Sequence, residues 1–138
     1  MEERTIHITQ YDLMRLRALI VETKRAERRK SAYLDSLAVE LARAKVVAPA
    51  EIPADVVTMN SRVRLLDLDT HEEMCYTLVF PQEADIGEAK VSVLAPIGTA
   101  VLGYRVGDTF TWPVPDGVRR FQVLEVLYQP QASGKDLQ

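Results

Sequence analysis

The sequence predicts an α+β fold: a short N-terminal antiparallel helical hairpin, then an antiparallel β-sheet domain with one short helix. Two observations support it. Apolar residues recur at helical spacing through the first fifty residues, and they alternate at strand spacing after about residue 60. Pro49 and Pro53 lie between the two regions and are expected to end the helical part. We therefore expect domains at 1–52 and 53–138.

The helical region has the signals of two helices. Thr9 can cap a first helix over 9–22, and Asp12 favours its N-terminus by charge. Ser31 can cap a second helix. The apolar stripes are Leu13, Leu16 and Ile20 on the first helix, and Leu34, Leu37, Leu41 and Ala44 on the second. Helices of about 15 residues are marginal alone, so the stripes are expected to pack against each other.

The second region has the signals of five strands. The expected strands are 62–69, 74–80, 90–96, 109–114 and 118–129. Asp69 and Thr70 mark a bend between the first two, and a short helical turn follows the third. On the last strand Phe121 and Val123 are expected inside, with Leu127 as a further candidate. Residues 131–138 are expected to form a frayed tail.

Composition excludes several classes of protein. The net charge of −3 and pI near 5.4 argue against a general nucleic-acid coat. No apolar run approaches the roughly 18–20 residues that span a bilayer, so no membrane partner is expected. The single cysteine, Cys75, excludes an internal disulfide and favours a cytoplasmic location, with the thiol half-buried in a strand.

No strong catalytic or cofactor motif is present. His7 and His71 lack a partner at metal-ligand spacing, and the chain has neither a Walker A sequence nor a dinucleotide Gly-x-Gly-x-x-Gly. We therefore predict no catalytic residue, no metal and no cofactor. A carboxylate cluster at the first strand bend could hold a cation, although a solvated turn is the commoner arrangement. Its members are Asp67, Asp69, Glu72 and Glu73.

The most basic stretch lies between the two expected helices. It contains Lys24, Arg25, Arg28, Arg29 and Lys30 against Glu27, a local net charge of +4 in a chain of net −3. Such a run can contact nucleic acid or an acidic surface, or it can simply be solvated. No aromatic residue is interleaved to stack on a base. Residues alone leave these alternatives open.

Three stretches of the second region resemble, in order and spacing, the C-terminal domain of the bacterial Gre transcript-cleavage factors. They are "NSRVRLLDLDTHEEMCYTLVFPQEADI", "VSVLAPIGTAVLGYRVGD" and "VPDGVRRFQVLEVLYQP". The shared features include the Asp-Thr–Glu-Glu hairpin, the "EADI" loop and a Ser-x-x-x-Pro segment. "PADVVTMNSRV" and "VLYQP" resemble still more closely the Gre-like subfamily with a shortened hairpin, the regulators of nucleoside diphosphate kinase.

The resemblance implies an FKBP-like sheet domain that docks at the rim of the secondary channel of RNA polymerase. It also implies competition with Gre factors for that rim, an effect on nucleotide-metabolism genes, and a monomer. The expected polymerase-docking residues are Ser92, Leu94, Ala95, Pro96 and Ile97. An apolar ridge held by a turn suits docking onto a partner surface.

The hairpin departs from the Gre pattern. Gre factors carry an Asp-x-x-Glu pair at the tip of a much longer hairpin, where it helps hold a catalytic magnesium. Here no acidic residue between Asp12 and Glu51 has another three places later. Arms of about 15 residues reach only ~20–25 Å. We therefore predict no stimulation of transcript cleavage and no enzymatic activity.

An alternative function is an FKBP-like peptidyl-prolyl isomerase, which fold analogy alone would suggest. It requires an aromatic-lined apolar pocket. Candidate lining residues are Phe80, Tyr104, Phe110, Trp112 and Phe121, although strand alternation places some of these in the core. RNA binding by the basic hairpin tip is a third option.

Overall fold

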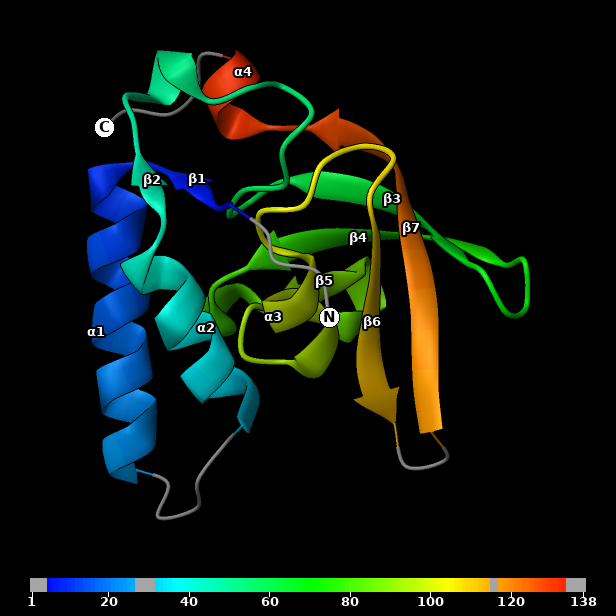
Figure 1. The fold of residues 1–138 in the computed structure, drawn as a ribbon, viewed down its shortest axis with the longest axis horizontal. Helices are drawn as coiled ribbons and strands as arrows, with labels where there is room; N and C mark the ends of the chain where they lie inside the picture. The colour runs from blue at the N-terminus through cyan, green and yellow to red at the C-terminus, as the bar shows by residue number, and fades with distance from the viewer. Residues whose placement is uncertain (1–4, 27–31, 115–116, 134–138) are drawn as a thin grey trace.

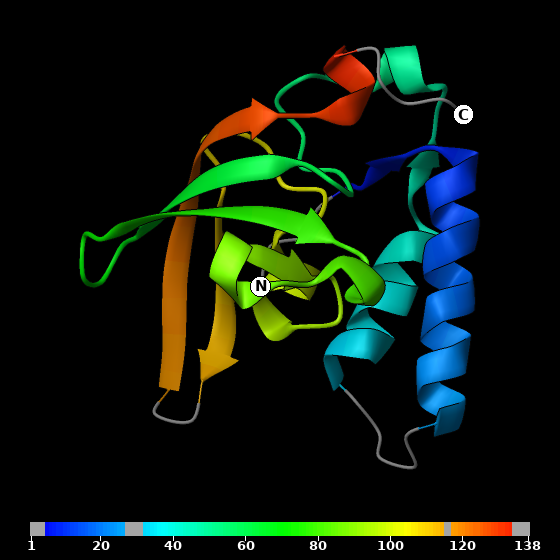
Figure 2. The ribbon, with the colours of Figure 1, turned by 180° about the vertical axis from the view of Figure 1, so that it is seen from behind.

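The structure is a computed structural model, and it describes residues 5–26, 32–114 and 117–133 of the chain. Figure 1 shows a helical hairpin on one side of the molecule and a β-sheet on the other, with a short helix between them. Figure 2 shows the same arrangement from behind. The predicted α+β fold is confirmed.

The hairpin consists of α1 (Gln10–Ala26) and α2 (Ala32–Ala42). The predicted cap is present, because the backbone N–H of Asp12 donates to Thr9 Oγ1 at 3.2 Å. Helix α1 continues about one turn beyond its predicted end. Helix α2 ends well before Pro49, contrary to prediction. Its last turn tightens through a bond from the Ala44 N–H to the Leu41 carbonyl at 3.1 Å, after which the chain becomes extended.

A two-stranded parallel sheet closes the base of the hairpin. Strand β1 (His7–Ile8) pairs with β2 (Lys45–Val46), and the Lys45 N–H donates to the Ile6 carbonyl at 2.8 Å. Ile6 also packs directly on Gly103, whose φ is +88° and where a Cβ would lie 2.6 Å from Ile6 Cγ1. The N-terminal segment is thus fixed both to the end of the hairpin and to the sheet domain.

The main sheet has five strands in the order β5-β4-β3-β7-β6. They are β3 (Arg62–Asp67), β4 (Glu73–Val79), β5 (Lys90–Ser92), β6 (Thr109–Val114) and β7 (Gly117–Tyr128). The predicted wholly antiparallel sheet is wrong in one pairing, because β5 runs parallel to β4. The connection between them contains two 3₁₀ turns, η2 (Pro81–Glu83) and η3 (Ile86–Glu88), which bring the chain back beside Thr77, so that β5 pairs with the second half of β4.

One continuous core joins the helices to the sheet. Leu16 of α1 and Leu37 of α2 belong to the same buried cluster as Val63 of β3 and Val123 of β7. The helical stripes therefore pack against the sheet domain as well as against each other, which supplies the stability that short helices lack. The domain boundary at residue 52 stays a prediction.

Strand β7 differs from its predicted alternation near its end. Phe121 and Val123 are buried as expected, but Leu127 is exposed and Val126 packs against the core instead. The pairing of β3 with β7 contains register shifts, and each shift exchanges the inward and outward faces of the strand.

The chain after β7 is not a frayed tail in the part that is described. Helix α4 (Pro130–Ser133) lies against η1 (Pro49–Glu51), and Gln131 is buried. The Thr58 hydroxyl donates to Gln131 Oε1 at 2.8 Å. Residues 134–138 lie outside the described part of the chain. Among the described helices, none is long and apolar enough to cross a membrane.

Candidate functional site

The predicted docking segment, Ser92 to Ile97, begins with a side-chain-stabilised turn. The backbone N–H of Leu94 donates to Ser92 Oγ at 3.0 Å, and the N–H of Ala95 donates to the Ser92 carbonyl at 3.0 Å. Strand β5 consequently ends at Ser92 rather than at the predicted residue 96. Pro96 then occupies the first turn of α3 (Pro96–Val101), where its missing N–H is not needed.

Residues of helix α3 after Ile97 bond to the first part of the docking segment and fix its conformation. The Thr99 hydroxyl donates to the Val93 carbonyl at 2.6 Å, and the Thr99 N–H donates to the Ala95 carbonyl at 2.9 Å. A Cβ on Gly98 would lie only 2.1 Å from the Ser92 carbonyl oxygen. Only glycine permits this approach, so the segment is a rigid turn and not an adaptable loop.

The docking segment exposes less apolar surface than the ridge predicted from sequence. Pro96 is exposed, whereas Leu94 and Ile97 are half-buried and pack against the core. Ser92 and Ala95 are also half-buried. The structure thus brings all five predicted residues into one turn, and Pro96 projects farthest into solvent. Their role in docking stays a prediction.

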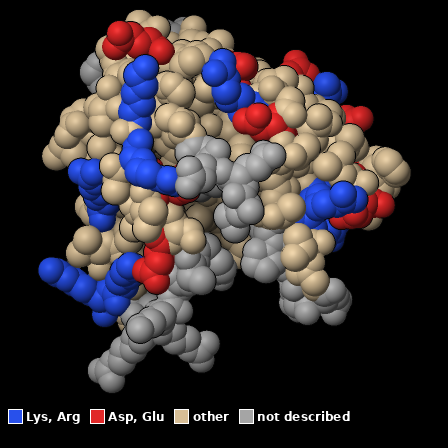
Figure 3. Space-filling view, viewed as in Figure 1, with Lys and Arg blue, Asp and Glu red and all other residues tan. Residues whose placement is uncertain are grey.

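The described part of the basic run belongs to helix α1. Lys24 and Arg25 occupy the last turn of α1, where positive charge favours the helix dipole, and Lys24 forms an ion pair with Asp35 at the start of α2. Arg25 is exposed. The other three predicted residues, Arg28, Arg29 and Lys30, lie outside the described residues. Figure 3 shows Lys and Arg side chains along the edge of the molecule formed by α1.

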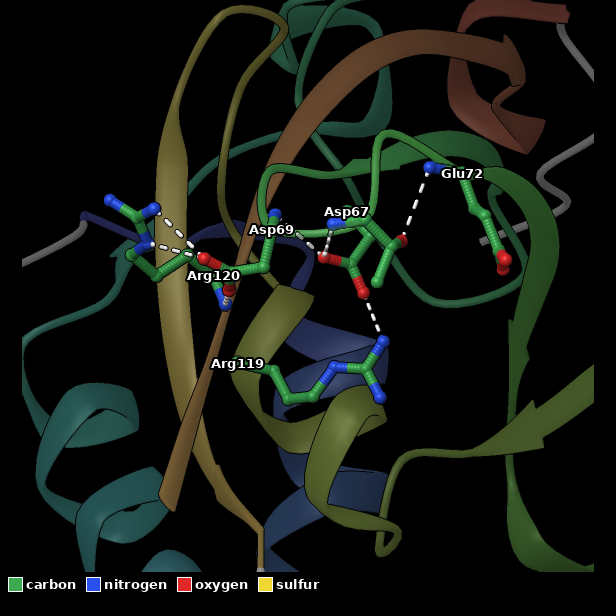
Figure 4. Close-up of polar contacts among 6 residues, drawn as sticks. Asp67, Asp69, Glu72, Arg119 and Arg120 are labelled. Atoms are coloured by element: carbon green, nitrogen blue, oxygen red, sulfur yellow. Dashed lines mark hydrogen bonds and ion pairs between the residues drawn. The ribbon is translucent and has the colours of Figure 1, made fainter. Parts of the chain in front are cut away.

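A second polar cluster lies at the bend between β3 and β4 (Figure 4). Asp67 Oδ1 accepts hydrogen bonds from the backbone N–H groups of Asp69 and Thr70 at 2.8 and 3.1 Å. Its other oxygen pairs with Arg119, and its side chain is 0% exposed. Beside it, the Arg120 guanidinium donates to Asp69 Oδ1 at 2.9 Å. These contacts tie the bend to strand β7.

The arginines set the electrostatics of this bend. The hydrogen bond from Arg119 lowers the pKa of Asp67 below its ordinary value, and Arg120 does the same for Asp69. The carboxylates of Asp67 and Asp69, named above as members of a cluster that could hold a cation, are thus paired with guanidinium groups of the chain itself. Across the described ranges, no group of three or more His, Cys, Asp or Glu is arranged to hold a metal ion.

Asp67 was expected in a solvated turn, although strand alternation indicates that its side chain is buried. Val63 and Leu65 alternate on the inner face of β3, and the same alternation places Asp67 on that face. A buried carboxylate needs a partner. The identity of the partner could not be inferred, because Arg119 is 52 residues away in the chain.

Four of the five aromatic residues proposed for an isomerase pocket instead fill the core. The ring of Phe110 stacks on Tyr104 and on Phe121, with centroids 5.2 and 5.9 Å apart. Phe80 is buried beneath the guanidinium of Arg15, 3.8 Å from the ring centroid. The side chain of Trp112 lies outside the described part of the chain. Cys75 is half-buried in β4, as predicted.

Two family matches divide the chain between them. Residues 4–47 match the family described as Rnk N-terminus. Residues 52–128, more than half of the chain, match the family described as transcription elongation factor GreA/GreB, C-terminal. The two matches are consecutive and correspond to the hairpin and the sheet.

Individual relatives agree with both matches. The chain is 48% identical over 101 residues to the regulator of nucleoside diphosphate kinase of Escherichia coli, covering 72% of this chain and 74% of that protein. It is 37% identical over 108 residues to transcription elongation factor GreA of Helicobacter hepaticus, covering 75% and 66%. A solved GreA/GreB factor from Nitrosomonas europaea superposes with a TM-score of 0.75 at 46% identity, covering 90% of this chain and all of that one.

Proposed function

Because this chain belongs to the GreA/GreB family of transcription elongation factors, in the branch with an Rnk-type N-terminal region, we propose that it is a regulator that binds RNA polymerase. It docks at the rim of the secondary channel and competes there with Gre factors. It does not stimulate transcript cleavage. The observation that carries this proposal is the order of the two family matches, with a short hairpin preceding a Gre-type sheet domain.

The dimensions of the hairpin support the absence of cleavage activity. Helix α1 has 17 residues and α2 has 11, which correspond to about 26 and 16 Å of helix. Arms of this length cannot carry a group far into a channel when the sheet domain remains at its rim. The short hairpin leaves the rest of the channel open, so occupying the rim is what would exclude a competitor.

The charges at the described ends of the hairpin support the same conclusion. The carboxylate of Asp35 pairs with Lys24, so it is not available as a magnesium ligand. Glu22 is exposed but has no acidic residue three places on. These residues do not fit the role that an acidic pair has in Gre factors, and we derive no cleavage step through a metal.

The fixed backbone turn of the segment from Ser92 to Ile97 supports a docking role for this segment. Its turn is fixed by the Ser92 hydroxyl, by Thr99 and by the close approach at Gly98. A surface that is already ordered loses little conformational entropy on binding. Pro96 is the residue most able to enter a pocket of the partner, since it is the exposed member of the segment.

Retention on purified core RNA polymerase tests the proposal. The chain at micromolar concentration and low salt should be retained, and a GreA-type factor should displace it. Failure to be retained would contradict polymerase binding. Retention without displacement would contradict the shared site while leaving the polymerase as partner.

A transcript-cleavage assay on stalled elongation complexes tests the negative part of the proposal. The chain alone should add no cleavage above the intrinsic rate of the polymerase. Added together with a GreA-type factor, it should reduce the cleavage that the factor stimulates. Cleavage by the chain alone would contradict the argument from hairpin length and charge.

The basic hairpin end has its own test. Changing Arg25, Arg28 and Arg29 to Glu should weaken retention and alter its salt dependence if this end touches an acidic surface or nucleic acid. Unchanged retention would assign these residues to solvent.

A monomer in a cytoplasmic location agrees with this function. The relatives are named as regulators and elongation factors, and no observation favours the isomerase alternative.

A further inference from the structure

Ile86 is the most exposed large hydrophobic residue in the described part of the chain. It is 94% exposed, whereas the next most exposed, Val118 and Met14, are 61% and 60% exposed. An isolated exposed apolar residue is common on a monomer and by itself indicates nothing. Three further features of its surroundings distinguish Ile86.

The first feature is that the backbone around Ile86 is well ordered by hydrogen bonds. Asp85 and Lys90 exchange two backbone hydrogen bonds, both 2.9 Å long, which close the loop at its base. The Ala89 N–H donates to the Ile86 carbonyl at 3.1 Å, and Ala89 takes a left-handed conformation with φ +57°. Ile86 is therefore held outward on a closed turn, and no strand or helix of the described chain covers it.

The second feature is the charge around Ile86. Residues 81–89 contain Glu83, Asp85 and Glu88 and no basic residue, a local net charge of −3. Glu88 pairs with Lys90 at 3.1 Å, but Glu83 and Asp85 form no ion pair within the described chain. Their negative charge is free to act on a partner. Acidic side chains around an apolar anchor are complementary to an apolar pocket bordered by Lys or Arg.

The third feature is the position of the loop beside the docking segment. Strand β5 begins directly after the loop and ends at Ser92, which is six residues after Ile86 in the chain. A fully extended chain of that length spans about 21 Å. An interface of ordinary size covers about 800 Å² on each partner, or roughly 30 Å across. An interface of this width can therefore span both Ile86 and Ser92.

We propose that Ile86 is an apolar anchor of the polymerase interface, inserting into a hydrophobic pocket whose border carries basic side chains that face Glu83 and Asp85. This inference rests on the proposed function, and it adds a second contact beside the segment from Ser92 to Ile97. It also specifies the chemistry of the partner surface. Ile86 provides the apolar contact of this loop, and the two carboxylates chiefly accelerate association.

Binding of the full chain to core RNA polymerase, measured at two salt concentrations, tests this inference. Ile86→Gln should raise Kd by about 10-fold, as for a central apolar contact. Met14→Gln on α1 is the matched control, because Met14 is also exposed and apolar but lies outside the sheet domain. It should leave Kd unchanged. Glu83→Lys should raise Kd by about 3-fold at low salt and have less effect at high salt.

The outcomes separate this inference from the proposed function. No binding by the unchanged chain would overturn the proposed function, and this inference with it. Binding by the unchanged chain together with an unchanged Kd for Ile86→Gln would overturn only the anchor. An equal loss in Ile86→Gln and Met14→Gln would also overturn it, since the effect would not be specific to the loop. A Glu83→Lys variant that binds more tightly would overturn the basic border.

Discussion

The bend at 67–73 and the loop at 81–89 both belong to the sheet domain and both concentrate carboxylates, yet they use them differently. In the bend, Asp67 and Asp69 pair with arginines of β7. In the loop, Glu83 and Asp85 are exposed and pair with no cation of the described chain. Acidic residues in a turn therefore do not all have the same role. Those in the bend stabilise the fold, and those in the loop remain available to a partner.

The two regions also differ in the side chain that each places at its centre. The central contacts of the bend are made by Asp67 at its first position, a charged side chain that is wholly buried. At the centre of the loop is Ile86, an apolar side chain that is almost wholly exposed. A buried charge requires pairing, and an exposed apolar side chain gains free energy when a partner removes it from water. Asp67 finds its partner within the chain, and we infer that Ile86 finds one outside it.

The largest expected effect comes from Gly98 of helix α3, whose backbone packs closely against the Ser92 carbonyl at the end of β5. Gly98→Ala should destabilise the protein by about 1–3 kcal/mol, because the new Cβ would overlap the Ser92 carbonyl oxygen. Urea unfolding measures the change. Gly87→Ala is the matched control within the loop, because there the nearest atom is a side-chain oxygen of Asp85 at 3.3 Å. A comparable loss in both variants would contradict the close-packing argument.

A smaller effect is expected when the buried and exposed carboxylates of the bend are compared. Asp67→Asn should lower the urea midpoint more than Asp69→Asn, because Asp67 is buried and accepts two backbone hydrogen bonds besides its ion pair. Asp69 is 43% exposed, so solvent weakens its pair with Arg120. Equal midpoints for the two variants would show that burial does not distinguish them.

The same bend should contribute to the dependence of stability on pH. Both carboxyls have a lowered pKa in the folded protein, against about 3.9 in an unfolded chain. Their stabilisation is therefore complete above about pH 4 and is lost as the pH falls through the folded values. Urea midpoints measured from pH 7 to pH 2 should fall less steeply in Asp67→Asn than in the unchanged chain. Parallel curves would contradict the pairing.

The smallest effect on stability is expected for a carboxylate of the loop. Glu83→Gln should change the free energy of unfolding by less than about 0.5 kcal/mol, because Glu83 is exposed and unpaired within the described chain. Thermal and urea unfolding would both detect a larger change. A loss of stability like that of Asp67→Asn would mean that the loop carboxylates also support the fold.

Much of the architecture could be predicted because its signals are local. The Thr9 cap and the burial of Leu13, Leu16 and Ile20 follow from spacing along one helix. The bend at Asp69 and Thr70 follows from residues that favour turns. The site was harder to predict. The five residues of the docking segment form one turn, but sequence overestimated their exposure because it did not show α3 packing on them.

Sequence by itself determined the two hairpin helices except for the end of α2, most strand positions, the family resemblance and the lack of an acidic pair at the hairpin tip. These depend on residues a few places apart or on the order of motifs. Only the tertiary structure decided the partner of Asp67, the parallel pairing of β5, the burial of Gln131 and the exposure of Ile86. The physical reason is that the residues in these contacts are far apart along the chain. Arg119 is 52 residues from Asp67 and Thr58 is 73 from Gln131, and such contacts depend on how the layers pack.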